Sequence, residues 1–159
     1  MSLIDKDQIP FQKQFFDYYL KGENSGIKKV KPVRLEVRES INKYLVRYED
    51  AWPIPDTEYR KLYLNGESQS LIEDTVSVKS SLGYDAKTGN ASYTFTFDKD
   101  TELSGNMKLR LWVSTSEGSD MDLFVGIKKL DNKGREVHFY AKTGFNKAPV
   151  ALGWLRVSQ

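Results

Sequence analysis

The sequence predicts a mostly β protein, a two-sheet sandwich with one helix at its N-terminus. Three observations favour this fold class. Apolar and polar residues alternate over many short runs, turn residues separate these runs, and helical spacing of large apolar residues is readable once, at the start of the chain. Because no strand–helix–strand rhythm follows, a parallel α/β sheet is not expected.

The one predicted helix covers residues 10–21. Pro10 suits the first helical position, and Gly22 follows the last residue as a C-terminal cap. A spacing of three and four residues places large side chains on one stripe, which is heavy for so short a helix. We therefore expect the helix to pack on a partner domain or subunit through Phe11, Phe15, Phe16, Tyr19 and Leu20.

A loop and a basic run follow the helix. Lys28, Lys29 and Lys31 precede Pro32. Such lysines either bind phosphate or nucleic acid or lie in a solvated connector, and we favour the connector because no aromatic or second basic cluster accompanies them. The sequence thus predicts a helix and linker over residues 1–31 and a β-sandwich domain over 32–159.

Short strands account for most of this second region. Alternation predicts strands near residues 33–38, 44–48, 62–64, 71–72, 76–78, 93–97, 107–114 and 123–127. The dipeptide Asn65-Gly66 and the segment 131–134 predict turns, the second within a hairpin. Pro53 and Pro55 interrupt the pattern, because proline cannot donate a hydrogen bond to a ladder.

Composition limits the partners that this chain can have. Its 159 residues carry a net charge of +2, from 24 basic and 22 acidic residues, so charge gives no reason to expect nucleic acid or an anionic membrane as a partner. The absence of cysteine excludes disulfides and thiolate chemistry. Because no apolar run is long enough to span a membrane or to form a secretory signal, we expect a cytoplasmic protein.

Groups that could perform catalysis are sparse. No Gly-x-Ser-x-Gly motif occurs, and the only histidine, His138, lies in a predicted strand, where a structural or surface role is favoured over that of a base or ligand. Asp120 and Asp122 share a strand face and are weak candidates for a metal site or an acid–base pair, but no calcium-loop motif surrounds them. We expect neither a cofactor nor enzymatic activity from this chain.

Aromatic residues offer another candidate site. Trp112 lies on the polar face of its predicted strand, and Phe124 points away from its apolar neighbours. Such rings either stack on sugars or belong to a strand that is buried on both faces, and we favour burial. If the chain is instead an independent carbohydrate-binding module, Trp112, Tyr84 and Tyr93 are the candidate ligand-binding residues.

Several segments, in order, resemble one class of serine hydrolases. Residues 15–22 with 32–37 are similar to the junction after the catalytic domain in the X-prolyl dipeptidyl-peptidase and cocaine-esterase class, CocE/NonD. Residues 48–59 resemble the segment that opens the C-terminal jelly roll of that family. The similarity continues, in the same order, through residues 62–64, 97–105, 109–114, 120–125 and 153–156.

The resemblance implies a jelly-roll, galactose-binding-like β-sandwich that packs on an α/β-hydrolase domain and helps to form its substrate pocket. The family's triad would precede Phe11, so no residue here inherits a catalytic role, and the parent activity would be serine-dependent hydrolysis of peptide, ester or amide bonds. Complete members continue past the segment that ends here at Arg156 with further strands, whereas this chain stops at Gln159. We therefore expect an accessory domain or truncated member, incomplete at its C-terminus, that forms a homodimer to cover exposed strand edges.

Overall fold

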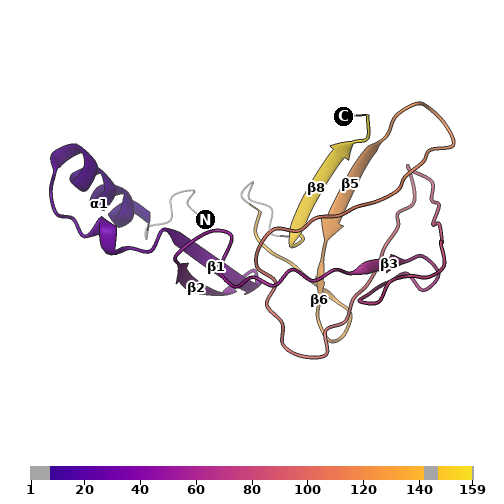
Figure 1. The fold of residues 1–159 in the computed structure, drawn as a ribbon, viewed down its shortest axis with the longest axis horizontal. Helices are drawn as coiled ribbons and strands as arrows, with labels where there is room; N and C mark the ends of the chain where they lie inside the picture. Colours follow the sequence, from indigo (N-terminus) through magenta and orange to yellow (C-terminus); the bar gives the residue numbers. More distant parts are fainter. Residues whose placement is uncertain (1–7, 142–146, 159) are drawn as a thin grey trace. The chain divides into compact units, whose positions relative to one another are not determined.

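The computed structural model describes residues 8–141 and 147–158. It consists mostly of short strands with one α-helix (Figure 1). This content confirms the expected class, a small β-sandwich protein with an N-terminal helix, whereas the jelly-roll connectivity stays a prediction. Contacts divide the chain into two compact units, Met1–Ile54 with Asn106–Gln159, and Pro55–Gly105. The predicted boundary between residues 31 and 32 also stays a prediction.

Helix α1 covers Gln8–Lys21 and so begins slightly before the expected start at Pro10. Proline is tolerated there because the first turn of a helix needs no amide donor. Gly22 has φ 72°, and its N–H donates to the Tyr18 carbonyl at 3.2 Å, which ends the helix in the expected left-handed cap. The 3₁₀ turn η1, Ile27–Lys29, follows. In the described part of the chain, no helix is long and apolar enough to cross a membrane.

An antiparallel hairpin follows the helix. Strands β1, Val33–Ser40, and β2, Lys43–Glu49, pair from Val33 opposite Glu49, with an irregularity near Ser40 (Figure 1). The predicted strands near 33–38 and 44–48 are therefore confirmed. The Phe11 ring lies 6.5 Å, centroid to centroid, from the Tyr48 ring, which links α1 to β2.

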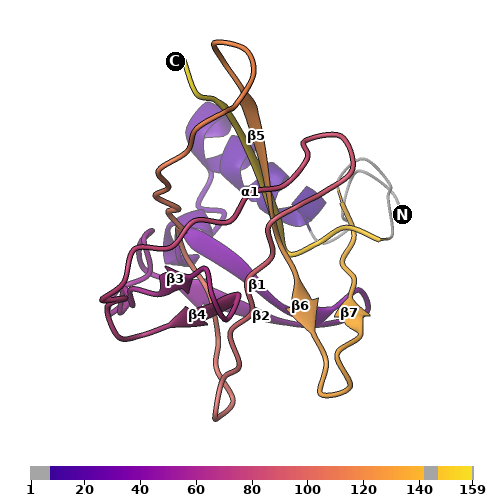
Figure 2. The same cartoon turned by 90° about the vertical axis from the view of Figure 1, so that its right-hand side faces the viewer.

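The unit Pro55–Gly105 contains one further hairpin. Strands β3, Tyr63–Asn65, and β4, Ser70–Ile72, are antiparallel (Figure 2). In the turn between them, Asn65 Oδ1 accepts the backbone N–H groups of Glu67 and Ser68 at 3.0 and 3.2 Å. The strand predicted near 93–97 is reduced to a single bridge between Ser70 and Thr94. Residues 76–78 form no strand.

Two nested hairpins form the C-terminal part. Strand β5, Asp122–Ile127, pairs antiparallel with β8, Ala151–Arg156, and the short strands β6, Lys129–Leu130, and β7, Glu136–Val137, pair between them (Figures 1 and 2). Gly134 has φ 75° in the β6–β7 turn, and its N–H donates to the Asp131 carbonyl at 3.0 Å, as the sequence predicts.

The described chain has little buried core. Phe139 is its only buried apolar side chain, whereas Trp112 is 100% and Phe124 82% exposed, so the expected burial of these two rings is wrong. Residues 107–114, predicted as a strand, form no ladder and are exposed. The physical reason is that the described ladders are only two-stranded, and Trp112 lies outside any of them, so little surface is available to cover these rings.

Candidate functional site

The first candidate surface lies on α1. A helix turns by about 100° per residue, so Ile9, Phe15, Phe16, Tyr19 and Leu20 share one stripe, which we call the α1 face. All of these side chains are exposed, and Leu20 is 76% exposed. The Phe15 ring packs on the rings of Tyr19 and Phe16 at centroid distances of 4.6 and 5.6 Å. Four of the five predicted packing residues therefore form one continuous, uncovered apolar surface.

The opposite side of α1 makes contacts within the helix and with the residues that follow it. Asp17 is only 6% exposed and accepts hydrogen bonds from Lys13 and from Lys21, whose Nζ lies 2.7 Å from Oδ1. These bonds, that from Lys13 first, hold the pKa of Asp17 below its usual value. Ser25 Oγ donates to the Gln14 carbonyl at 2.5 Å, and the Lys28 ammonium lies 4.9 Å from the centroid of the Tyr18 ring.

This arrangement fixes which face of the helix remains available. Phe11, the fifth predicted packing residue, lies toward Tyr48 rather than on the α1 face. The polar contacts of Asp17 and Ser25 belong to the same inner side. Because the Phe11–Tyr48 and Ser25–Gln14 contacts orient α1 within its unit, the α1 face is exposed and can meet another partner.

The second candidate surface lies on the β5–β8 ladder. Residues directly opposite in an antiparallel ladder point to the same side, so Phe124 and Trp154 form one row, with Gly126 and Leu152 in the next. We call Phe124, Gly126, Leu152 and Trp154 the β5–β8 face. Trp154 is 77% and Leu152 68% exposed. An open hollow of about 310 Å³ lies at one end of this face, lined by Asp122, Phe124, Trp154, Leu155 and Arg156.

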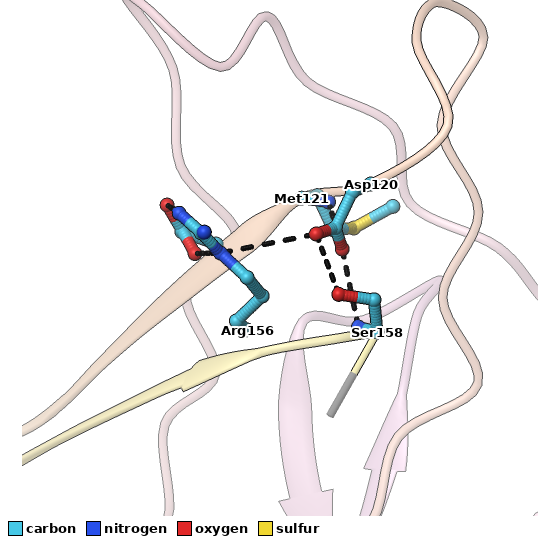
Figure 3. Close-up of polar contacts among 5 residues, drawn as sticks. Asp120, Met121, Arg156 and Ser158 are labelled. Carbon is cyan, nitrogen blue, oxygen red and sulfur yellow. Dashed lines mark hydrogen bonds and ion pairs between the residues drawn. The ribbon is translucent and has the colours of Figure 1, made fainter.

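Two carboxylates join the ends of β5 and β8 (Figure 3). Arg156 donates from Nε and Nη2 to the two oxygens of Asp122, at 2.9 and 3.0 Å, in a bidentate pair. Asp120 accepts the Ser158 hydroxyl at 2.7 Å, the Ser158 N–H at 3.1 Å and the Met121 N–H at 2.8 Å. Its Oδ2 lies 3.8 Å from Arg156 Nε.

These bonds give Asp120 and Asp122 a structural role. The hydrogen bonds from Arg156 lower the pKa of Asp122, and the Ser158 hydroxyl is the main cause of the lowered pKa of Asp120. Among the residues that the structure describes, no group of three His, Cys, Asp or Glu side chains could hold a metal ion. The metal-site hypothesis for Asp120 and Asp122 stays a prediction, and the bidentate pair with Arg156 does not favour it.

The other predicted residues belong to neither of the two faces. His138 directly follows β7 and is half-buried, and its Nδ1 lies 3.6 Å from Glu136 Oε1. Trp112 belongs to the unit that contains Asn106–Gln159, whereas the exposed Tyr84 and the half-buried Tyr93 belong to Pro55–Gly105. The role of these three aromatics in ligand binding therefore stays a prediction.

Sequence reasoning did not single out Leu152 or Trp154 as site residues. A signal does exist, because Leu152, Trp154 and Arg156 recur every second residue. The intervening Ala151, Gly153 and Leu155 are also apolar or small, however, so the local pattern does not say which row is exposed. Only the register with β5 places Trp154 opposite Phe124.

Comparison with known proteins gives a consistent result. The model of the X-Pro dipeptidyl-peptidase C-terminal non-catalytic domain matches residues 25–159. Cocaine esterase from Rhodococcus sp. (strain MB1 Bresler) is 44% identical over 61 residues, which cover 38% of this chain and 10% of that protein.

Solved structures extend the similarity over nearly the whole chain. Two crystal structures of a CocE/NonD family hydrolase from Staphylococcus aureus are 46% identical to it, with TM-scores of 0.91 and 0.92 over 97% and 96% of this chain. The chain spans only 28% of the length of each of these solved relatives.

Proposed function

Because the chain belongs to the family of X-Pro dipeptidyl-peptidase C-terminal non-catalytic domains, we propose that it packs on an α/β-hydrolase catalytic domain and shapes the wall of its substrate pocket. The exposed α1 face is the observation that carries this proposal. Covering each of its large side chains would contribute roughly 1.5 to 3 kcal/mol, whereas a helix of this length is marginal by itself in water.

The position of α1 along the chain also supports this contact. The helix precedes residues 25–159, which the domain family matches, and yet the hydrolase structures extend over 97% of the chain. An element that lies before the family domain and inside the larger hydrolase is suited to connect the two. In this proposal the partner domain supplies the serine-dependent chemistry, the hydrolysis of peptide, ester or amide bonds.

Further parts of the proposal concern location and assembly. We propose a cytoplasmic protein that needs no cofactor, forms a homodimer, and has no nucleic acid or membrane as partner. The nearly balanced charge of +2 supports the last point, because phosphate-rich partners favour a strongly basic surface.

A chimera tests the contact with the catalytic domain. This chain replaces the 46% identical segment of the S. aureus hydrolase, and turnover of p-nitrophenyl esters and X-Pro anilides is measured together with the melting temperature. The double variant Phe16→Ser/Leu20→Ser should lower both quantities, because it removes apolar contacts from the α1 face. Tyr44→Ser, which removes an exposed ring from β2, is the matched control and should leave both unchanged.

Two results would contradict the proposal. The first is a chimera whose turnover and melting temperature do not respond to the α1 variants. The second is turnover by the isolated chain that a serine-directed inhibitor abolishes, because the reactive serine would then lie within this chain.

A second function is favoured by the complete exposure of Trp112. An uncovered indole is a stacking platform for sugar rings, so an independent carbohydrate-binding module is the alternative. On a glycan array, specific binding that Trp112→Ala weakens would favour carbohydrate binding over packing on a catalytic domain. The absence of any binding would argue against the carbohydrate-binding function.

A further inference from the structure

We propose that the hollow at the end of the β5–β8 face binds a neutral sugar. One pyranose ring stacks on Phe124 and Trp154, and Asp122 and Arg156 bind its hydroxyl groups. This inference goes beyond the proposed packing on a catalytic domain and does not depend on it. It also names a different site from Trp112, on which the carbohydrate-binding alternative above rests. The volume of the hollow, about 310 Å³, lies at the lower end of the range for small-molecule sites.

The register of β5 and β8 places a polar row directly beside an aromatic row. Asp122 lies opposite Arg156 in this ladder. The next pair on the same side is Phe124 opposite Trp154, because side chains two residues apart leave one side of a strand. Two residues along a strand span about 7 Å, which is close to the width of a pyranose ring with its hydroxyl groups. A sugar ring on the aromatic row therefore brings one polar edge to the polar row.

The aromatic row suits the apolar side of a sugar. One face of a pyranose ring presents C–H groups, and aromatic rings pack on such a face while the hydroxyl groups at its rim stay in contact with polar groups or water. Phe124 and Trp154 are 82% and 77% exposed, whereas the alternate residues of β5, on its other side, are half-buried. The two rings therefore form an outward platform on a ladder whose β5 strand is held from the other side.

The polar row is oriented and still has hydrogen-bonding capacity. Arg156 donates from Nε and Nη2 to Asp122 at 2.9 and 3.0 Å, in a bidentate pair that fixes the orientation of both groups. Arg156 Nη1 donates to no residue that the structure describes, and each carboxylate oxygen can accept a second hydrogen bond. The pair thus offers donors and acceptors side by side. Neighbouring sugar hydroxyls need both, because each hydroxyl donates and accepts.

Charge selects the class of ligand. The charges of Asp122 and Arg156 cancel, and Asp120 Oδ2 lies 3.8 Å from Arg156 Nε. A carboxylate or phosphate ligand would therefore meet an excess of negative charge. A quaternary ammonium group could contact the aromatic rings, but it has no hydroxyl group for the polar row. A neutral sugar uses both rows.

Nuclear magnetic resonance titration of the isotope-labelled chain tests the proposal through the indole N–H signals of its three tryptophans. The probes are the methyl glycosides of glucose, galactose and mannose, each added up to about 50 mM, because so small and open a contact corresponds to a dissociation constant of about 1 to 10 mM. The Trp154 signal should shift and saturate with at least one of these sugars. The signals of Trp52 and Trp112 should not move.

Variants locate the bound sugar, and their affinities are measured from saturation-transfer spectra of the sugar, which need no indole signal. Trp154→Val should weaken binding at least about tenfold, and Arg156→Lys about three- to tenfold, because lysine lacks the planar fork of arginine. Valine favours strands, so Trp154→Val should keep the melting temperature of the wild type. Trp112→Ala removes another exposed indole of the same unit, and this matched control should bind like the wild type.

Three results would overturn the proposal. The first is a Trp154 signal that moves with none of the sugars. The second is binding that Trp112→Ala weakens as much as Trp154→Val does. The third is saturation of the Trp154 signal by adenosine or tetramethylammonium at concentrations as low as those of the sugars, because stacking on the rings alone would then explain binding. The α1 variants of the chimera test the packing on a catalytic domain separately, so either proposal can fail alone.

Discussion

Phe139 is the described side chain whose truncation should destabilise the protein most. It is the only buried apolar residue in the described part of the chain, and its backbone exchanges two hydrogen bonds of 2.9 Å with Ala148. Phe→Ala in a packed interior costs about 3 to 5 kcal/mol, the sum of lost burial and a remaining cavity. Because the neighbouring side chains are only partly buried and can move into the space, we expect the lower end, about 3 kcal/mol, for Phe139→Ala.

Urea unfolding followed by far-ultraviolet circular dichroism measures this cost. The chain is kept at one low concentration, so that self-association does not contribute to the stability. Tyr140→Ala, at the exposed next position, is the control and should cost less than about 1 kcal/mol. Phe139→Leu keeps the position apolar and should cost less than about 1.5 kcal/mol. Equal losses for Phe139→Ala and Tyr140→Ala would refute the inference that Phe139 is the centre of the core.

Two further predictions concern the cap of α1 and the carboxylates of β5. Gly22→Ala should lower the free energy of unfolding by about 1 kcal/mol and reduce the dichroism at 222 nm, because a φ of 72° disfavours a side chain even though no atom lies within 4 Å of the added Cβ. Gly22→Asn should lower the stability less, because asparagine tolerates this φ better. Equal losses of stability in the two variants would argue against the cap. The pKa values of Asp120 and Asp122 are lowered from 3.8 in the folded chain, so their contribution to stability is present above that pH and is lost as the pH falls through the lower folded values. The melting temperature should drop in this acidic range, and a profile that Asp122→Asn leaves unchanged would show that the Arg156 pair is not responsible.

Local signals in the sequence predicted local structure well. The spacing of apolar residues located α1, Gly22 and Gly134 marked a cap and a turn with positive φ, and alternation located β5. The segment 107–114 has an equally clear alternation but forms no ladder. Alternation indicates that a segment can form a strand. A strand also needs a partner strand to pair with, and the local pattern does not say which segment of the chain that is.

The same distinction explains the two candidate surfaces. The residues of the α1 face share one helix, so their spacing predicted a packing stripe that the structure shows to be exposed. The β5–β8 face combines two segments that are remote in sequence, and its composition depends on the register that places Phe124 opposite Trp154. The expectation that Phe124 would be buried was wrong because the pattern of one strand carries no information on whether a second sheet covers it.

The nested arrangement of the last four strands has a consequence for the order of folding. The β6–β7 hairpin lies inside the segment 128–150, which joins β5 to β8 (Figure 2). Short hairpins close within microseconds, and a closed inner hairpin shortens the effective loop that the outer pair must close, which lowers the entropy that the outer pair loses. The inner turn at Gly134 should therefore form early. The residue pairs of the β5–β8 ladder should then form in order, from Ile127–Ala151 to Asp122–Arg156. In such a sequence of events, the bidentate ion pair is the last part of the ladder to form.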